Sequence, residues 1–255
     1  MSDSRIYDLI TDLKNYLREC KNLGVNYIPF ETVKRVDDIS KKIKKAKKKK
    51  VNNQNIQQIK EITNLSDLEH LISNCKLCEL YKTRKKVVFG EGSTNPILML
   101  VGEAPGREED LTGRPFVGRS GELLTKMLRA INIERKEVFI TSVIKCRPPR
   151  NRTPTEAEIQ SCKPYLLKQI ELLDPKLILC LGTTASRALL GNKGPLSKIR
   201  GTFFTVDGRK IMVTYHPAFL LRFAGAKQIE LKRQAWQDLQ ILQKEYEKLK
   251  KNSIT

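Results

Sequence analysis

The sequence predicts an α/β fold of three layers, in which helices cover both faces of a central four-stranded parallel sheet and a helical basic extension precedes it. Two observations support this prediction. Composition changes after about residue 60, and beyond that point short apolar segments ending in polar or glycine-rich turns alternate with helical patterns. Such alternation is typical of βαβ units. The expected strands span residues 97–101, 138–140, 177–181 and 211–214.

The helices expected between and after these strands follow from apolar residues at helical spacing. Ahead of the first strand, Asn64 and the acidic residues behind it predict a capped helix start at residues 64–69. The last helix should close the fold against the sheet. The remaining helical segments are expected at residues 121–131, 155–173, 184–190 and 228–250.

The charge of the chain points to a polyanionic partner. Its 255 residues include 48 Lys and Arg against 28 Asp and Glu, a net charge of +20. This balance favours nucleic acid over an anionic membrane surface. No apolar run approaches the ~20 residues of a membrane span, and residues 1–30 lack the apolar core of a signal peptide. We therefore expect a cytoplasmic protein that does not use a membrane.

Residues 1–60 are predicted to be an extension separate from a main domain at residues 61–255. They carry 15 Lys and Arg against 7 Asp and Glu. Apolar residues at helical spacing predict an amphipathic helix at about residues 4–22. The lysine-rich and then Asn/Gln-rich segment 40–58 predicts a linker, because like charges repel one another and bury little surface.

Four of the six cysteines are candidates for one metal centre. Cys75 and Cys78 form a CxxC pair, whereas Cys146 and Cys162 lie far downstream, the first of them in a polar, basic segment. Four thiolates suit either zinc or a [4Fe-4S] cluster, so the ligand count leaves both open. The alternative is a redox dithiol for the pair and core packing for the other two. Cys180, within an apolar strand, is expected in the core.

Six motifs in one order carry a resemblance to a known family. They are Cys75-x-x-Cys78, Phe89-Gly90-Glu91-Gly92, Gly102-Glu103-Ala104-Pro105-Gly106, Gly113-Arg114-Pro115-Phe116-Val117-Gly118, Lys145-Cys146-Arg147-Pro148-Pro149 and His216-Pro217-Ala218. Over residues 70–245 the chain resembles the family-four uracil-DNA glycosylases, the iron–sulfur type of archaea and thermophilic bacteria. Residues 1–60 lie outside the resemblance.

The resemblance implies a DNA repair enzyme that hydrolyses the N-glycosidic bond of uracil and leaves an abasic site. It also implies a structural [4Fe-4S] cluster on Cys75, Cys78, Cys146 and Cys162, with zinc as the alternative metal. The base must leave the helical stack before the sugar carbon beneath it is attacked. Uracil-containing DNA, single- or double-stranded, is then the partner, and a monomeric, prokaryotic, archaeal-type protein is expected.

Each motif residue receives a role from the same resemblance. Phe116 is expected to stack on the flipped base, and His216 to donate a hydrogen bond to uracil O2 as negative charge develops. Glu103 is expected to position the attacking water, with Glu108, Glu109 and Asp110 as competitors. Close approach of backbone to the base is expected at Gly102, Ala104 and Gly106.

One position departs from the family pattern. Members usually carry Asn at the strand end where this chain has Ser142. An Asn amide can read both N3–H and O4 of uracil, whereas a hydroxyl is shorter and needs a bridging water. We therefore expect uracil excision with weaker discrimination or a lower rate.

The DNA contacts are the last set of expectations. Leu220 is a candidate wedge for the gap left by the flipped base, with packing under the final helix as the alternative. Arg147, Arg150, Arg152, Arg200 and Arg222 are candidates for phosphate contacts. The basic extension is expected to add non-specific affinity or to bind a replication clamp. The competing hypothesis is a non-catalytic or altered-specificity iron–sulfur DNA-binding protein on the same fold.

Overall fold

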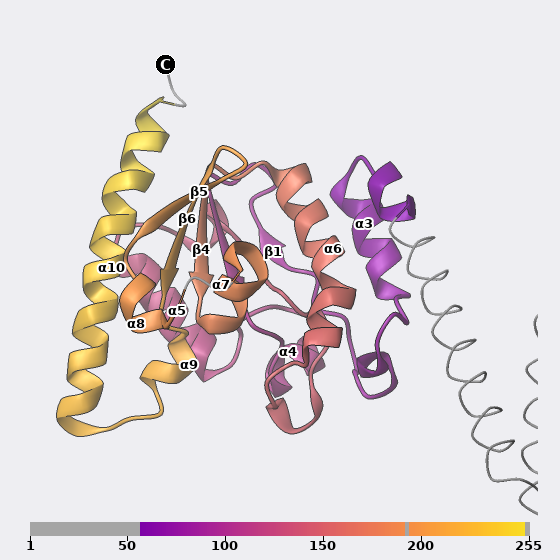
Figure 1. The fold of residues 1–255 in the computed structure, drawn as a ribbon, viewed down its shortest axis with the longest axis horizontal. Coiled ribbons are helices and arrows are strands. Elements are labelled where there is room, and N and C mark those ends of the chain that lie inside the picture. Colours follow the sequence, from indigo (N-terminus) through magenta and orange to yellow (C-terminus); the bar gives the residue numbers. More distant parts are fainter. Residues whose placement is uncertain (1–56, 192–193, 253–255) are drawn as a thin grey trace, which may run out of the picture. The chain divides into compact units, whose positions relative to one another are not determined.

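The computed structural model describes residues 57–191 and 194–252, so the predicted helix at 4–22 and most of the linker lie outside the described residues. The described part contains a six-stranded sheet with the order β1-β3-β2-β4-β6-β5 (Figure 1). Its four central strands are mutually parallel, as predicted. They are β2 (Leu98–Gly102), β3 (Phe139–Ser142), β4 (Leu177–Leu181) and β6 (Arg209–Thr214).

Two antiparallel edge strands extend the sheet beyond the four that the sequence predicts. β1 (Glu91–Gly92) pairs with β3, and β5 (Phe203–Val206) pairs with β6 through a hairpin. Neither is fully buried, so neither carries the continuous apolar run typical of a central parallel strand. The prediction of an α/β fold is confirmed, and its sheet of four strands is corrected to a mixed sheet of six.

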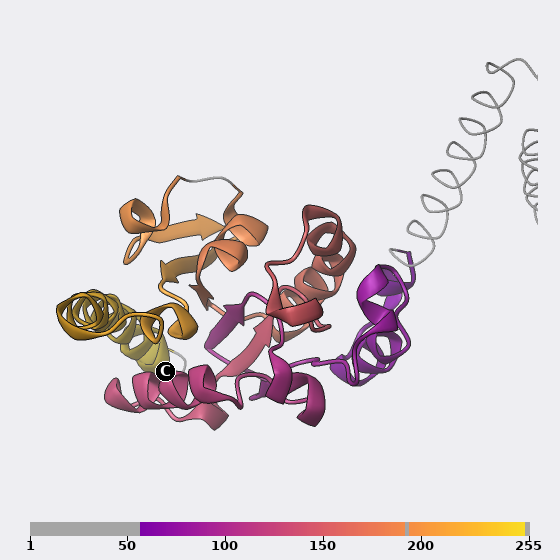
Figure 2. The ribbon, with the colours of Figure 1, turned by 90° about the horizontal axis from the view of Figure 1, so that it is seen from below.

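Alternate residues of the central strands face two separate hydrophobic cores, because side chains along a strand point to opposite faces. In β2, Met99 and Val101 face the core that contains α3 and α6. Leu98 and Leu100 face the core that contains α5 and α10. Figure 2 shows helices on both sides of the sheet, which makes the predicted three layers.

The helices lie close to their predicted ranges. Asn64 caps α3 with its side chain, which accepts a hydrogen bond from the Asp67 N–H at 2.9 Å, as the sequence indicates. The α-helices are α3 (Leu65–Ser73), α4 (Arg107–Thr112), α5 (Arg119–Ala130), α6 (Glu156–Leu173), α7 (Thr183–Leu190), α8 (Leu196–Ile199), α9 (Pro217–Leu220) and α10 (Gly225–Asn252). Short 3₁₀ turns are η1 (Glu79–Lys82), η2 (Arg135–Glu137) and η3 (Pro149–Asn151).

A buried ion pair anchors α10 to the end of the sheet. Asp238, which is 1% exposed, accepts from the Thr214 hydroxyl at 2.6 Å and pairs with Arg200 at 2.8 Å. These bonds hold the last residue of β6, and hence the His216 segment that follows, against the final helix. Within the described ranges, none of the helices has the length and apolar character of a membrane span.

Candidate functional site

A cleft of about 860 Å³ opens where the parallel strands end. Each central strand delivers a lining residue to it, since parallel strands finish at the same edge of a sheet. These residues are Glu103 after β2, Ser142 at the end of β3, Gly182 after β4 and His216 after β6. The prediction that the polar strand ends converge is confirmed. Helices α4 and α9 lie at this end of the sheet in Figure 1.

Phe116 is held in the cleft by an unusual backbone conformation. Its φ is 50°, in the left-handed region that residues with a side chain rarely adopt. Gly121 makes room for this conformation, because a Cβ there would lie 1.8 Å from the Phe116 carbonyl oxygen. Its ring stacks on the imidazole of His216 with centroids 5.5 Å apart and planes 30° apart. A costly loop geometry of this kind is typical of functional sites.

His216 has a fixed tautomer. Its Nδ1 accepts a hydrogen bond from the Ala218 N–H at 3.1 Å, so a neutral ring carries its proton on Nε2. Burial and the nearby Arg222 guanidinium lower the pKa of His216 to about 4, which keeps the ring neutral near pH 7. His216 therefore offers the cleft an uncharged N–H donor.

The carboxylates of the Gly102–Asp110 segment have different roles. Glu109 accepts from the backbone N–H groups of Gly106 at 3.1 Å, Val117 at 2.9 Å and Gly118 at 3.1 Å, and so ties the Phe116 loop to α4. Asp110 accepts from the Lys85 N–H at 2.9 Å.

Glu103 differs from both, because its carboxylate accepts a hydrogen bond from a side chain, the Thr184 hydroxyl. Two of its three competitors are thus occupied with backbone groups, and the third, Glu108, is exposed. Ala104 and Gly106 line the cleft beside Glu103.

Gly102 and Ser142 are register partners across β2 and β3. A Cβ on Gly102 would lie 2.5 Å from the Phe116 ring and 3.2 Å from Ser142 Oγ. Gly102 therefore makes room for the Phe116 ring beneath the cleft and is absent from its lining, which differs from the expected direct contact with a base. Ser142 is 4% exposed and does line the cleft.

The five candidate arginines fall into two groups. Arg152 and Arg222 line the cleft, and Arg147 and Arg150 lie on the adjoining loop around η3. Arg200 is different, because its side chain is 15% exposed and paired with the buried Asp238, whereas Arg152, which pairs with Glu158, is 43% exposed. The interpretation of Arg200 as a phosphate contact is corrected here to an anchor for α10.

Leu220 requires the same kind of correction. Its side chain is 1% exposed and packs in the core shared by α5 and α10. A wedge must reach the DNA stack, so the structure favours the alternative, packing under the final helix. Phe219, the residue before it, lines the cleft instead.

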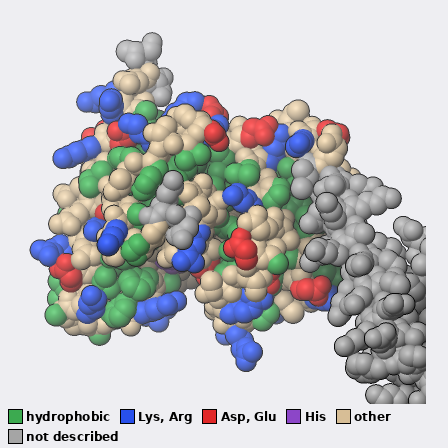
Figure 3. All heavy atoms as spheres, in the orientation of Figure 1, with side chains coloured by type: hydrophobic (Ala, Val, Ile, Leu, Met, Phe, Trp, Pro, Cys, Tyr) green, Lys and Arg blue, Asp and Glu red, His purple; other side chains and the backbone are tan. Residues whose placement is uncertain are grey.

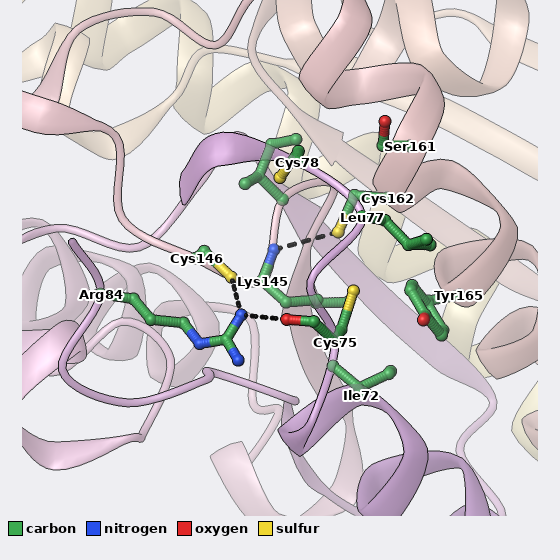
Figure 4. A pocket seen from close by; sticks show the side chains of 11 residues that line it. Ile72, Cys75, Leu77, Cys78, Arg84, Lys145, Cys146, Ser161, Cys162 and Tyr165 are labelled. Carbon is green, nitrogen blue, oxygen red and sulfur yellow. Dashed lines mark hydrogen bonds between the residues drawn. The ribbon is translucent and has the colours of Figure 1, made fainter. Parts of the chain in front are cut away.

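The four predicted cysteines line one small cavity of about 10 Å³ (Figure 4). Cys75 and Cys78 follow α3, Cys146 follows β3 and Cys162 lies on α6, and all four are free thiols. The hydroxyl of Tyr165, on the cavity wall, is buried and meets no described group at hydrogen-bonding geometry. In the described part of the chain, no three Cys, His, Asp or Glu side chains are arranged to hold one metal ion.

A guanidinium and a backbone N–H donate to thiols of this cysteine cavity. Arg84 donates to Cys146 Sγ at 3.3 Å and to the Cys75 carbonyl at 2.8 Å, as Figure 4 shows. The Lys145 N–H points at Cys162 Sγ, 3.4 Å away. Burial raises the pKa of Cys146 to about 11 and that of Cys162 to about 12, so the thiols are neutral without a bound metal.

The fully buried Lys145 also connects the cysteine cavity to the cleft. Its ammonium donates to the Ser142 carbonyl at 2.8 Å and to Gln169 Oε1 at 2.6 Å, and it contacts the Thr141 hydroxyl. Sequence reasoning missed this residue as well as Thr184 and Arg187, which line the cleft or contact Glu103. The glycine turn after β4 was the available signal for Thr184, because strand ends carry ligand sites in such sheets.

Several known proteins with similar sequences are uracil-DNA glycosylases. The model of the uracil DNA glycosylase superfamily matches residues 89–240. The type-4 uracil-DNA glycosylase of Thermotoga maritima is 44% identical over 171 residues, which are 66% of this chain and 88% of that protein. The type-4 enzyme of Pyrobaculum aerophilum is 46% identical over 162 residues, 60% of this chain and 82% of that protein.

A more distant relative is the type-5 uracil-DNA glycosylase of Pyrobaculum aerophilum, 31% identical over 156 residues, 54% of this chain and 69% of that protein. The chain belongs to the uracil DNA glycosylase superfamily. The family expected from the motifs is thereby confirmed.

Proposed function

We propose that this protein is a DNA repair glycosylase that flips uracil out of DNA and hydrolyses its N-glycosidic bond. The observation that carries the proposal is the convergence of Phe116, Glu103, Ser142 and His216 on one cleft. The similarity to type-4 enzymes supports the same reaction. A base stacked inside a duplex is out of reach of such a cleft, so a cleft of this kind serves an enzyme that acts on flipped bases.

His216 is proposed to stabilise the leaving base. As the glycosidic bond lengthens, negative charge gathers on the uracil oxygens, and a fixed neutral donor placed there lowers the barrier. The Nδ1 bond from Ala218 orients this donor before substrate arrives. Phe116, stacked beside His216, is proposed to supply the aromatic face for the base.

Glu103 is proposed to align the water that attacks the sugar carbon. Its carboxylate lines the cleft and is steered by the Thr184 hydroxyl. A carboxylate hydrogen-bonded to water holds it in one orientation and accepts its proton as the new C–O bond forms. The proton leaves the water, and the electron pair of the broken C–N bond goes to the departing base.

Ser142 is proposed to read the edge of the base. It lines the cleft at the end of β3, the position at which the resembled family carries Asn. The serine hydroxyl is a single group that donates and accepts, whereas an Asn side chain accepts through its carbonyl oxygen and donates through its NH₂ group. We expect weaker rejection of cytosine than an Asn would give.

The cysteine cavity is proposed to hold a structural [4Fe-4S] cluster. Four free thiols share the cavity, an unsatisfied tyrosine hydroxyl lies on its wall, and the Arg84 guanidinium and the Lys145 backbone N–H donate to two of the sulfurs. A single zinc needs thiolate sulfurs about 3.7 Å apart, given Zn–S bonds of about 2.3 Å in a tetrahedron. In a four-iron cluster each thiolate binds its own iron, so the four sulfurs need not all lie within bonding distance of one metal ion. When bound, the group would crosslink the three segments that carry these cysteines.

The remaining proposals concern DNA and partners. Arg147, Arg150, Arg152 and Arg222 border the cleft or its adjoining loop and are proposed to contact phosphates. The extension at residues 1–60 is proposed to add salt-dependent affinity, with a replication clamp as the second candidate partner. A monomer that acts in the cytoplasm of an archaeal-type cell stays a prediction.

An excision assay tests the proposed function. The parent protein, Glu103→Gln, His216→Ala and the control Phe203→Leu, outside the cleft, are incubated with oligonucleotides that carry uracil or deaminated purines. We expect the parent and the control to release uracil and the two site variants to be slower by about a hundredfold or more. Tight DNA binding without release of any base would instead identify a binding module, and release of purines alone an enzyme of altered specificity.

A further inference from the structure

A row of aromatic rings leads away from the uracil site along the cleft. Phe219 stacks on Tyr215 with ring centroids 5.4 Å apart and planes 20° apart. Phe223 then meets Phe219 edge-on at 5.2 Å. The Tyr215 hydroxyl is held by Gln234 at 2.8 Å, so the inner end of the row is fixed.

Phe219 is the middle ring of this row, between Tyr215 and Phe223. It lies three residues after His216, on the single turn of α9, and both residues line the cleft. It is half-buried, whereas Leu220 beside it is 1% exposed. A half-buried ring that lines the cleft and is already held by two neighbouring rings can contact a planar ligand at little cost in side-chain entropy.

The surroundings of the row suit a polyanion. Arg222 and Lys227 are exposed and line the same cleft. In Figure 3, hydrophobic side chains gather over α9 and the beginning of α10, and Lys and Arg side chains lie at their border. Exposed aromatic faces next to cations are the combination by which proteins hold unpaired nucleic acid strands.

We infer that Phe219 stacks on the base next to the flipped uracil, so that the cleft grips two nucleotides of the damaged strand. This inference rests on the proposed function and adds a second stacking position to it. Because Leu220 is buried, the aromatic ring takes over the task of holding the neighbouring base apart from uracil. Stacking does not read the identity of the base, since every base has a π face.

Binding to a non-cleavable substrate tests the inference. A single-stranded oligonucleotide carries 2′-fluoro-deoxyuridine, and its 5′ or 3′ neighbour is either adenosine or an abasic tetrahydrofuran. Fluorescence anisotropy gives Kd for the full-length parent, Phe219→Leu, Phe219→Tyr and Phe203→Leu. Phe203 is the matched control, because it is a half-buried phenylalanine packed against the same core but absent from the cleft lining.

We expect loss of the neighbouring base on one side to weaken parent binding by about tenfold, the usual scale for one stacked base. In Phe219→Leu, loss of the same neighbouring base should raise Kd by less than about twofold. Phe219→Tyr and Phe203→Leu should behave like the parent. The inference is overturned by a parent indifferent to both neighbours, by a Phe219→Leu variant that keeps the difference, or by a control that loses it equally.

Failure of the inference differs from failure of the proposed function. A parent that releases uracil but binds without regard to neighbouring bases contradicts only the second stacking position. A parent that neither releases uracil nor prefers the uracil analogue over thymine contradicts the proposed function itself.

Discussion

The cysteine cavity and the catalytic cleft lie on opposite sides of one short segment, yet their physical character differs. The cavity measures about 10 Å³, and burial raises the pKa of its Cys146 and Cys162 thiols to about 11 and about 12. The cleft measures about 860 Å³ and is lined by carboxylate, imidazole, hydroxyl and guanidinium groups. A closed apolar site suits a group that stays, and an open polar site suits a ligand that enters and leaves.

The segment from Thr141 to Cys146 joins these regions. Ser142 lines the cleft, Cys146 lines the cavity, and the Lys145 ammonium lies buried between them. The two regions therefore share one support. Variants that affect one region, both or neither will show how far that support couples them.

The largest effect is expected when a cysteine of the cavity is replaced. With the proposed [4Fe-4S] cluster in the cavity, Cys162→Ser should lose most of the iron and the broad visible absorbance, because a hydroxyl is a poor ligand for a soft metal centre. Iron content and thermal unfolding measure the result. Cys180→Ala is the matched control, since Cys180 is buried but outside the cavity. Equal iron in both variants would contradict the assignment.

A variant of the cleft should slow chemistry and leave the cavity intact. His216→Ala removes the fixed donor, and single-turnover uracil release should fall by about 10²–10³-fold. Its iron content should match that of the parent. A rate within about threefold of the parent would exclude His216 as the stabilising donor.

Lys145→Met is expected to affect both regions. It leaves three buried oxygen acceptors without their donor, so the free energy of unfolding should fall by about 2–4 kcal/mol. Denaturant unfolding measures this change, and iron retention and uracil release report on each region. Lys176→Met, at an exposed ion pair, should change stability by less than about 1 kcal/mol. Similar losses in the two variants would contradict the coupling role.

Ser142→Asn should change specificity more than stability. The longer amide reaches further into the cleft, and we expect uracil release to rise or cytosine rejection to improve by about tenfold. Competition between uracil- and cytosine-containing oligonucleotides measures the preference. An unchanged rate together with an unchanged preference would show that Ser142 does not read the base.

The smallest effect concerns pH. The pKa of His216 is lowered to about 4 by burial, so uracil release should not depend on this group between pH 6 and 8 and should fall about twofold near pH 4. In the unfolded chain the histidine titrates near its ordinary value of 6.5. Its contribution to stability is therefore complete above pH 6.5 and is lost as the pH falls towards 4. A rate that changes steeply through pH 6.5 would contradict a neutral, buried His216.

The sequence by itself determined the class of fold and most of the site. The continuous apolar runs at residues 97–101 and 177–181 predict buried strands. A residue that directly follows such a strand lies at the edge of the sheet where ligands bind. Glu103 and His216 were predicted for that reason and through their motifs. The shared cavity of four cysteines was also predicted, because a polar, basic setting for Cys146 is unusual for a core residue.

Tertiary structure decided which of the candidate side chains are available. Arg200 is taken by Asp238 and Leu220 by the core, whereas Thr184 reaches Glu103 from another element. The edge strands β1 and β5 likewise depend on their partners. Local patterns specify what a residue does within its own helix or strand. Which distant residue it meets depends on how those elements pack, because ion pairs, stacking and burial act through space and not along the chain.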